Sequence, residues 1–160
     1  YRAALFSSAD TVIRITADCP LLDPKVSFET LDLFLRKKSD YVSNVHPPTY
    51  PDGMDTEVFT FGSLEIVYKS ANKDYQKEHV TPYIYENPDV FKIYNHQSKK
   101  DLSGFRFVVD NEDDFTFMQK IYEVYGNSFY TVDHENLVEC LIQHPDLKSI
   151  KLSGRRNEKY

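Results

Sequence analysis

The sequence predicts an α/β protein in which helices cover the faces of a layered β-sheet. Short apolar runs rich in β-branched residues alternate along the chain with longer segments of helical periodicity, which favours this class. Two of the predicted strands end in a carboxylate, at Asp18 and at Asp110. Because ligands of open α/β sheets bind outside the carboxyl ends of the strands, these two acids mark the candidate site.

The first half of the chain supplies the clearest predicted elements. Residues 1–8 resemble the tail of a helix, and residues 12–17 a buried strand that Pro20 prevents from continuing. A helix is expected from Pro24, with Asp23 as its N-cap and basic residues 36–38 at its end. Further predicted segments are a strand over 40–44, a loop with three prolines over 45–53, a strand over 55–61, and helices over 63–71 and 77–86, the last with Pro82 inside it or at a break.

The second half repeats the same pattern. Residues 91–95 and 105–109 flank a Lys-rich loop and are predicted to pair as a hairpin. Helices are expected over 112–125 and 134–143. Residues 1–152 are assigned to one domain, and residues 153–160 to a tail that is either disordered or foreign to the natural protein.

Composition narrows the class of function. The chain has 160 residues, 41% hydrophobic and 28% charged residues, and a formal net charge of −6. A general nucleic-acid binder would show a basic surface, and no apolar run approaches the length of a membrane span. Cys19 and Cys140 lie far apart without metal-type spacing, so we expect reduced, buried thiols and a cytoplasmic protein.

Asp18 and Asp110 are the candidate catalytic and metal-binding residues. By the alternation of a strand, Arg14 shares a face with Asp18, and Arg106 shares one with Asp110. Two strand-end carboxylates suit Mg²⁺ or Mn²⁺ in phosphate chemistry, because Mg²⁺ takes one or two carboxylates and completes its shell with water and phosphates. The structural alternatives are that Asp18 caps a turn and that Asp110 is the N-cap of the following helix.

Other polar residues are candidates for substrate binding. Asp55 and Glu57 share a strand face and either hold sugar hydroxyls or support the metal, or lie on a solvated edge strand. His79 is either a pocket residue or a structural hydrogen-bonding group at a helix start. Arg14 and Arg106 either form buried ion pairs within their sheet or bind an anionic sugar or phosphate, which suits the arginine fork.

Five segments together resemble the SpsF-type spore-coat polysaccharide branch of the cytidylyltransferases. They are residues 12–24 (around Asp18-Cys19-Pro20), Tyr41-Val42-Ser43-Asn44, residues 51–59 (Pro-Asp-Gly-Met-Asp-Thr-Glu-Val-Phe), residues 78–84 (Glu-His-Val-Thr-Pro-Tyr-Ile) and residues 109–115 (Val-Asp-Asn-Glu-Asp-Asp-Phe). The resemblance runs to about Leu147. It implies a Rossmann-like nucleotidyltransferase fold, three-layer α/β/α with a mixed, mostly parallel sheet. It also implies that Asp18 and Asp110 are the metal carboxylates, and it favours a sugar-pocket role for His79.

The activity that the resemblance implies is transfer of CMP from CTP to a sugar, expected to be a sugar acid, with release of pyrophosphate in spore-coat or surface polysaccharide biosynthesis. CTP, a sugar and a second copy of the chain are the expected partners. The alternatives are a metal-dependent glycosyltransferase that uses a nucleotide sugar, and a noncatalytic fragment or oligomerisation module.

One departure from the family is large. The family opens with a basic, Gly-containing loop, Arg-x-x-Ser-x-Arg-Leu-Pro-Gly-Lys, and this chain, which begins at Tyr1, contains none. We therefore expect that about the first third of the domain is absent, that an uncovered strand edge lies beside the Asp18 strand, and that the intact protein is the enzyme while these 160 residues alone are inactive.

Overall fold

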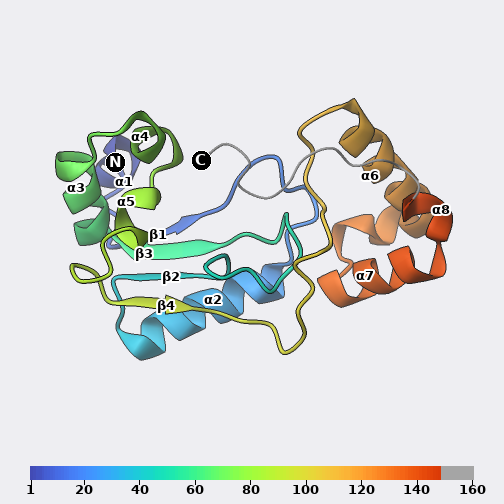
Figure 1. Ribbon diagram of the computed structural model, residues 1–160, viewed down its shortest axis with the longest axis horizontal. Coiled ribbons are helices and arrows are strands. Elements are labelled where there is room, and N and C mark those ends of the chain that lie inside the picture. Colours follow the sequence, from blue (N-terminus) through green and yellow to red (C-terminus); the bar gives the residue numbers. More distant parts are fainter. Residues whose placement is uncertain (149–160) are drawn as a thin grey trace. The chain divides into compact units, whose positions relative to one another are not determined.

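The computed structural model describes residues 1–148, which form two compact units (Figure 1). The predicted tail, residues 153–160, lies outside the described residues. The first unit comprises Tyr1–Arg14, Phe28–Pro47 and Thr56–His96, and the second Ile15–Ser27, Pro48–Asp55 and the chain from Gln97 onward. None of the described helices is long and apolar enough to cross a membrane.

The first unit contains a four-stranded mixed sheet in the order β1-β3-β2-β4. Its strands are β1 (Thr11–Arg14), β2 (Tyr41–Ser43), β3 (Glu57–Thr60) and β4 (Ile93–Asn95). β3 runs antiparallel to both β1 and β2, whereas β2 and β4 pair in parallel. β1, β2 and β4 thus share one direction, but β3 lies between β1 and β2. Two of the three strand pairings are therefore antiparallel, and the expectation of a mostly parallel sheet is wrong at the level of pairing.

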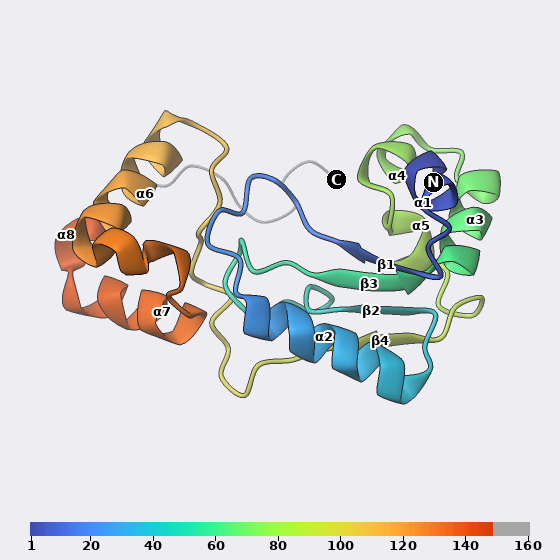
Figure 2. The same ribbon diagram turned by 180° about the vertical axis from the view of Figure 1, so that it is seen from behind.

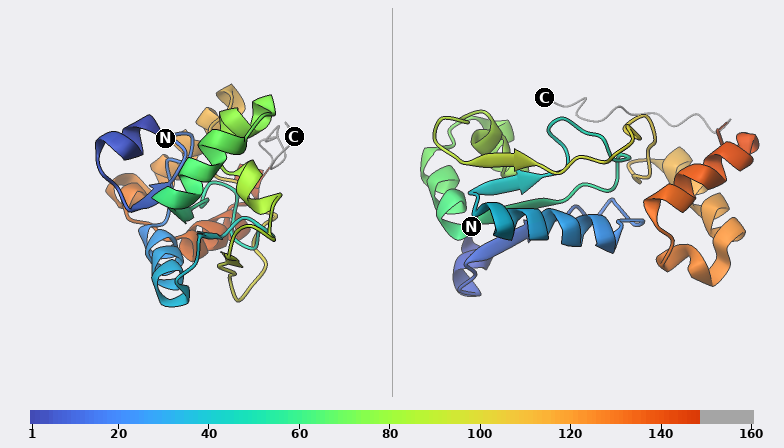
Figure 3. Two further views of the ribbon diagram at one scale, coloured as in Figure 1. Left: turned by 90° about the vertical axis from the view of Figure 1, so that its left-hand side faces the viewer. Right: turned by 90° about the horizontal axis from the view of Figure 1, so that it is seen from below.

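Helices cover both faces of this sheet, as predicted for a three-layer arrangement (Figures 2 and 3). Val42 and Val58 point to one face, where they pack against Phe34 of α2 (Pro24–Lys37). Tyr41 and Phe59 point to the other face, where they pack with the buried side chains of Leu64, Val67, Ile84 and Phe91. The helices of this unit besides α2 are α1 (Arg2–Phe6), α3 (Phe61–Ser70), α4 (Asp74–His79) and α5 (Pro82–Tyr85).

The second unit is built from helices and extended loops around its own apolar core. Its helices are α6 (Glu112–Tyr125), the 3₁₀ segment η1 (Gly126–Tyr130), α7 (His134–Gln143) and α8 (Pro145–Lys148). Phe107, Ile121 and Leu137 are fully buried in this core. The structure confirms the predicted helices over 112–125 and 134–143. Each begins at its predicted residue because its cap, Asn111 or Asp133, accepts a backbone N–H of the first turn.

Three predicted elements differ from the structure. The strand expected over 12–17 ends at Arg14, because its partner strand β3 begins at the paired residue Glu57. The helix expected over 77–86 is two helices, because Val80 has φ +69° and Pro82 lacks the N–H that a continuous helix requires. The hairpin between 91–95 and 105–109 is absent from the described residues, because β4 pairs instead with β2, fifty residues upstream.

The segment 105–109 is extended but makes only one ladder bridge with another part of the chain that the structure describes, between Asp52 and Arg106. The Phe107 amide donates to the Asp52 carbonyl at 2.7 Å, and the Asp52 amide donates to the Phe105 carbonyl at 2.9 Å. The ladder stops there because the Met54 amide, which would continue it, donates instead to the Pro51 carbonyl in the turn at Gly53, where φ is +100°. Gly53 therefore determines where the Asp52 side chain is presented.

We predict that Gly53→Ala destabilises the protein by roughly 2–4 kcal/mol. A Cβ at this position would lie 2.5 Å from the Phe107 carbonyl oxygen, and the backbone conformation is unfavourable for alanine. Urea unfolding measures the loss. Gly104→Ala is the matched control, because a Cβ there meets nothing within 4 Å, and equal stability of the two variants would contradict the prediction.

A buried, hydrogen-bonded pair of Asp23 and His134 joins the starts of α2 and α7 within the second unit. His134 Nδ1 lies 2.7 Å from Asp23 Oδ2, the His134 amide donates to the same oxygen at 3.2 Å, and the Lys25 amide donates to Asp23 Oδ1 at 2.8 Å. The last contact confirms Asp23 as a helix cap. Burial alone would raise the pKa of Asp23, but these hydrogen bonds and the charge of His134 lower it to about 2.

This depressed pKa predicts an acid-dependent loss of stability. Because the folded-state pKa of Asp23 lies below its unfolded value, the pair stabilises the fold above about pH 4 and loses this contribution as the pH falls toward 2. Between pH 5 and pH 2, wild type should lose on the order of 1–2 kcal/mol more than Asp23→Asn in urea unfolding. The exposed Asp89→Asn should follow wild type, and parallel pH curves for wild type and Asp23→Asn would refute the assignment.

Candidate active site

The two predicted metal carboxylates lie on hydrogen-bonded neighbouring segments of the second unit. The Val109 amide donates to the Asp18 carbonyl at 2.9 Å, which places Asp18 beside Asp110 along the backbone. Asp18 is half-buried, and the Asp110 side chain is 52% exposed. Neither residue ends a regular strand: Asp18 lies in the loop after β1, and Asp110 directly precedes the cap of α6. The hydrogen bond nevertheless makes the two segments that carry these acids neighbours.

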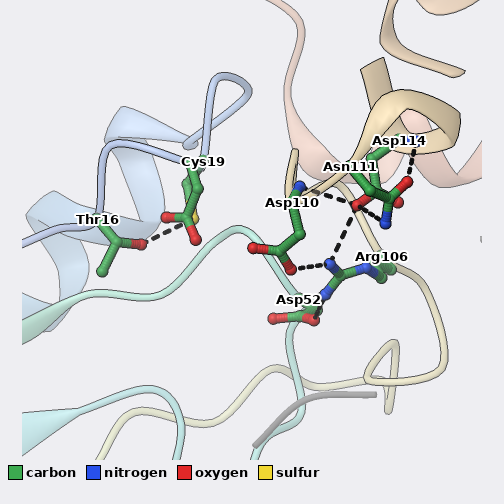
Figure 4. A network of polar contacts seen from close by, with 8 residues as sticks. Thr16, Cys19, Asp52, Arg106, Asp110, Asn111 and Asp114 are labelled. Atoms are coloured by element: carbon green, nitrogen blue, oxygen red, sulfur yellow. Dashed lines mark hydrogen bonds and ion pairs between the residues drawn. The ribbon is translucent and has the colours of Figure 1, made fainter. Parts of the chain in front are cut away.

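The carboxylates of Asp18 and Asp55 both raise the pKa of the Cys19 thiol. The Cys19 thiol lies 3.6 Å from Asp18 Oδ1 and 3.1 Å from the Thr16 hydroxyl (Figure 4). Burial, together with the negative charges of Asp18 and Asp55, raises the pKa of Cys19 to about 12. The thiol is thus protonated and half-buried rather than fully buried as predicted, while Cys140 is buried. Both carboxylates thus disfavour ionisation of the Cys19 thiol.

Arg106 is bound by three carboxylates, as Figure 4 shows. Its Nη1 donates to Asp52 Oδ2 at 2.6 Å, and its Nη2 donates to Asp110 Oδ2 and, at 3.4 Å, to Asp114 Oδ2. Burial lowers the pKa of Arg106, but its bonds to Asp110 and Asp52 and the charge of Asp114 outweigh this and raise it. Of the two interpretations of Arg106, the structure shows the ion pair.

Asp114 connects Arg106 to the backbone around Asp110. It is fully buried, and its Oδ2 accepts the Asp110 amide at 2.9 Å and the Asn111 side-chain amide at 3.0 Å. In return the Asp114 amide donates to Asn111 Oδ1, which makes Asn111 the N-cap of α6. The alternative of Asp110 as the helix cap is therefore wrong.

Sequence reasoning did not single out Asp52 or Asp114. A signal for Asp114 was present, because Asn-x-x-Asp follows the spacing of a capping box with an acid at the third helical position. Asp52 was placed only in the loop over 45–53 and in the family segment 51–59. Its contact with Arg106 joins residues 54 positions apart, which no local pattern indicates.

Arg14 and Glu57 form an ion pair in the sheet of the first unit. Glu57 lies on β3, between two other strands, and is 4% exposed, so the interpretation of a solvated edge strand is wrong for this residue. The Tyr41 hydroxyl donates to Glu57 Oε1 at 2.5 Å, and burial together with the Glu57 charge raises the pKa of Tyr41 well above its usual range. Arg14 thus forms the ion pair within its sheet, which was the structural alternative to binding an anionic sugar or phosphate.

His79 is the last residue of α4, not the start of a helix as expected. It is half-buried in the first unit, and its Nε2 lies 3.9 Å from a carboxylate oxygen of Glu78. Arg14, Glu57 and His79 thus belong to the first unit, whereas Asp18, Asp55, Arg106 and Asp110 belong to the second.

The donor set around Asp18 and Asp110 fits a hard cation that keeps water. Among residues 1–148, no three His, Cys, Asp or Glu side chains are arranged to hold a metal together. Mg²⁺ needs only one or two carboxylates from the protein. Asp110 is exposed and contacts Arg106 through Oδ2, so Asp18 and Asp110 are compatible with such an ion.

A family model described as cytidylyltransferase matches residues 1–134 of this sequence. The chain belongs to the cytidylyltransferase family. The family resemblance predicted from the motifs is thereby confirmed, and with it the α/β nucleotidyltransferase-like fold.

Individual relatives agree with this family. The chain is 34% identical over 158 residues to an uncharacterized protein of Methanocaldococcus jannaschii, covering 98% of this chain and 63% of that protein. It is 25% identical over 138 residues to the spore coat polysaccharide biosynthesis protein SpsF of Bacillus subtilis, covering 84% and 56% respectively. The solved structure of a cytidylyltransferase from Leptospira borgpetersenii superposes with a TM-score of 0.87 at 27% identity, covering 97% of this chain and 65% of that one. This cytidylyltransferase chain therefore spans about three fifths of the length of these relatives.

Proposed function

We propose that these residues belong to an enzyme that transfers CMP from CTP to a sugar and releases pyrophosphate. The observation that supports the proposal is the Val109–Asp18 backbone hydrogen bond, which makes the segments of the two candidate carboxylates neighbours in a chain of the cytidylyltransferase family. A sugar acid as acceptor, and a role in surface or spore-coat polysaccharide synthesis, form part of the proposal. The name of the Bacillus subtilis relative supports the polysaccharide role.

The reaction forms one bond to the α-phosphorus and breaks another. A sugar hydroxyl attacks the α-phosphorus of CTP, the bond to the bridging oxygen of the β-phosphate breaks, and pyrophosphate and the hydroxyl proton leave. Mg²⁺, when bound, stabilises the negative charge that develops on the phosphate oxygens. Asp18 and Asp110 are the residues that would hold it, and without a cation their charges would oppose binding of the triphosphate.

The remaining candidates take different parts in this proposal. Asp55 supports the metal carboxylates from the outer shell, consistent with its shared influence with Asp18 on Cys19. Arg14, whose side chain is 29% exposed, has access to an anionic substrate despite its pair with Glu57. Arg106 is 12% exposed and saturated by carboxylates, so a role in holding Asp110 suits it better than direct substrate binding. His79 stays a candidate for the sugar pocket, whereas Glu57, 4% exposed and bound by Arg14 and Tyr41, suits a supporting role better than direct contact with the sugar.

Our first prediction for this function concerns the two acids. Asp18→Asn and Asp110→Asn should each lower kcat at least 100-fold, since each removes a charged metal ligand, while the melting temperature changes by only a few degrees. CTP-dependent pyrophosphate release is measured on the natural polypeptide that contains these residues at its full length, with Mg²⁺ and a panel of sugar acids. Asp113→Asn, an exposed acid in the first turn of α6, is the matched control and should retain full activity. Wild-type rates in either of the first two variants would refute the assignment.

The second prediction concerns the nucleotide. Calorimetric titration of the same polypeptide with Mg²⁺ should show tighter binding of CTP than of UTP or ATP. This expectation rests on membership in the family. Equal binding of UDP-sugars without any release of pyrophosphate would favour a glycosyltransferase and contradict the proposal.

A further inference from the structure

Asp110 is fixed at two points by a single polar network. Its carboxylate is bound by Arg106 Nη2, and its own amide donates to Asp114 Oδ2 at 2.9 Å. The amide of the preceding residue, Val109, donates to the Asp18 carbonyl. The direction of the Asp110 side chain and the position of Asp18 therefore both depend on the backbone that Asp114 holds.

Arg106 is itself oriented by carboxylates on both sides. Nη1 binds Asp52, and Nη2 is shared between Asp110 and Asp114 (Figure 4). A planar guanidinium bound at both ends cannot rotate without breaking one of these bonds. Arg106 thus presents its Nη2 to Asp110 in one direction, which fixes the Asp110 carboxylate through Oδ2.

The cluster carries more negative charge than Arg106 can neutralise. Three carboxylates and one guanidinium give a formal charge of −2. The exposed fractions of the side chains are 0% for Asp114, 11% for Asp52 and 52% for Asp110, so Asp110 is the acid of the three that solvent cations reach. The excess negative charge of the two inner acids, Asp52 and Asp114, strengthens the attraction of Asp110 for a divalent cation.

Stability alone does not account for this arrangement. Asp114 Oδ1 and Arg106 Nε are buried without a hydrogen-bond partner within the described residues. Such atoms lose their hydration without compensation, and a buried ion pair often stabilises no more than apolar residues of the same size. A requirement for one fixed direction of the Asp110 carboxylate explains why the network is charged.

We propose that Asp114 and Asp52, acting through Arg106, are positioning residues that hold the Asp110 carboxylate for a divalent cation. This inference rests on the proposed function, in which Asp18 and Asp110 bind that cation. Asp114 acts twice, on the Asp110 amide and on Arg106, whereas Asp52 acts through Arg106 alone. Loss of Asp114 should therefore weaken cation binding more than loss of Asp52.

The test is a titration with Mn²⁺ alone, in which electron paramagnetic resonance counts the free ion. Asp114→Asn preserves the side-chain volume and removes the charge, and it should bind Mn²⁺ at least 10-fold more weakly than wild type, as loss of an outer-shell partner typically does. Asp52→Asn should weaken binding by a smaller factor, and Asp110→Asn should abolish it. Asp133→Ala, which removes the cap of α7 in the same unit, is the control for destabilisation and should bind like wild type. All titrations are run below the melting temperature of each variant, with folding verified by circular dichroism.

The outcomes separate the two proposals. If wild type binds Mn²⁺ and folded Asp114→Asn and Asp52→Asn bind it equally well, the positioning role is wrong and the metal site stands. If wild type binds no Mn²⁺, or if Asp110→Asn binds it as wild type does, the metal site itself is wrong, and the positioning role fails with it. Should Asp114→Asn not fold, Asp52→Asn carries the test. Tighter Mn²⁺ binding by Arg106→Lys would show that Arg106 competes with the cation and would also overturn the proposal.

Discussion

The guanidinium of Arg106 joins two segments of the second unit that lie more than fifty residues apart in sequence. Asp52 belongs to a turn fixed by Gly53, and Asp110 and Asp114 belong to the start of α6. Removing any one of these carboxylates alters the charge that holds the other two, so their energies are coupled rather than additive. The backbone that carries Asp110 is arranged by this coupled group, and through the Val109 amide so is its contact with Asp18.

The first unit contains a comparable but simpler buried group. Glu57 lies in the middle of the sheet and is satisfied by one cation, Arg14, and one neutral donor, Tyr41. Here a single negative charge meets a single positive charge, so no excess charge remains to attract a cation. The difference between the two groups lies in the number of carboxylates around each arginine, which sequence spacing did not indicate.

Local patterns predicted the parts of this fold that local forces determine. The helices beginning at Pro24, Glu112 and His134 were predicted because their caps and apolar periodicity lie within a few residues of each start. Strand ends and pairings were predicted poorly, because a strand is defined by its partner. The segment 105–109 has the composition of a strand, yet the turn at Gly53 in the opposite segment limits it to one bridge within residues 1–148. The parallel pairing of β4 with β2 is likewise set by contacts across fifty residues.

The candidate site shows the same division between local and distant information. Asp18 and Asp110 were predicted as candidates because each follows an apolar run and belongs to a recognisable motif. Asp52 and Asp114 were missed because, although Arg106 was predicted to form an ion pair, the sequence does not indicate which carboxylates surround it. The buried and the exposed acids of this network differ in what they can bind. A carboxylate with no exposed surface, as in Asp114, can act only on its protein neighbours, whereas one that is half exposed, as in Asp110, can also exchange water for a ligand. The gradient of exposure across one charged network therefore limits the inner acids to contacts with the protein and leaves the outer one, Asp110, accessible to a ligand.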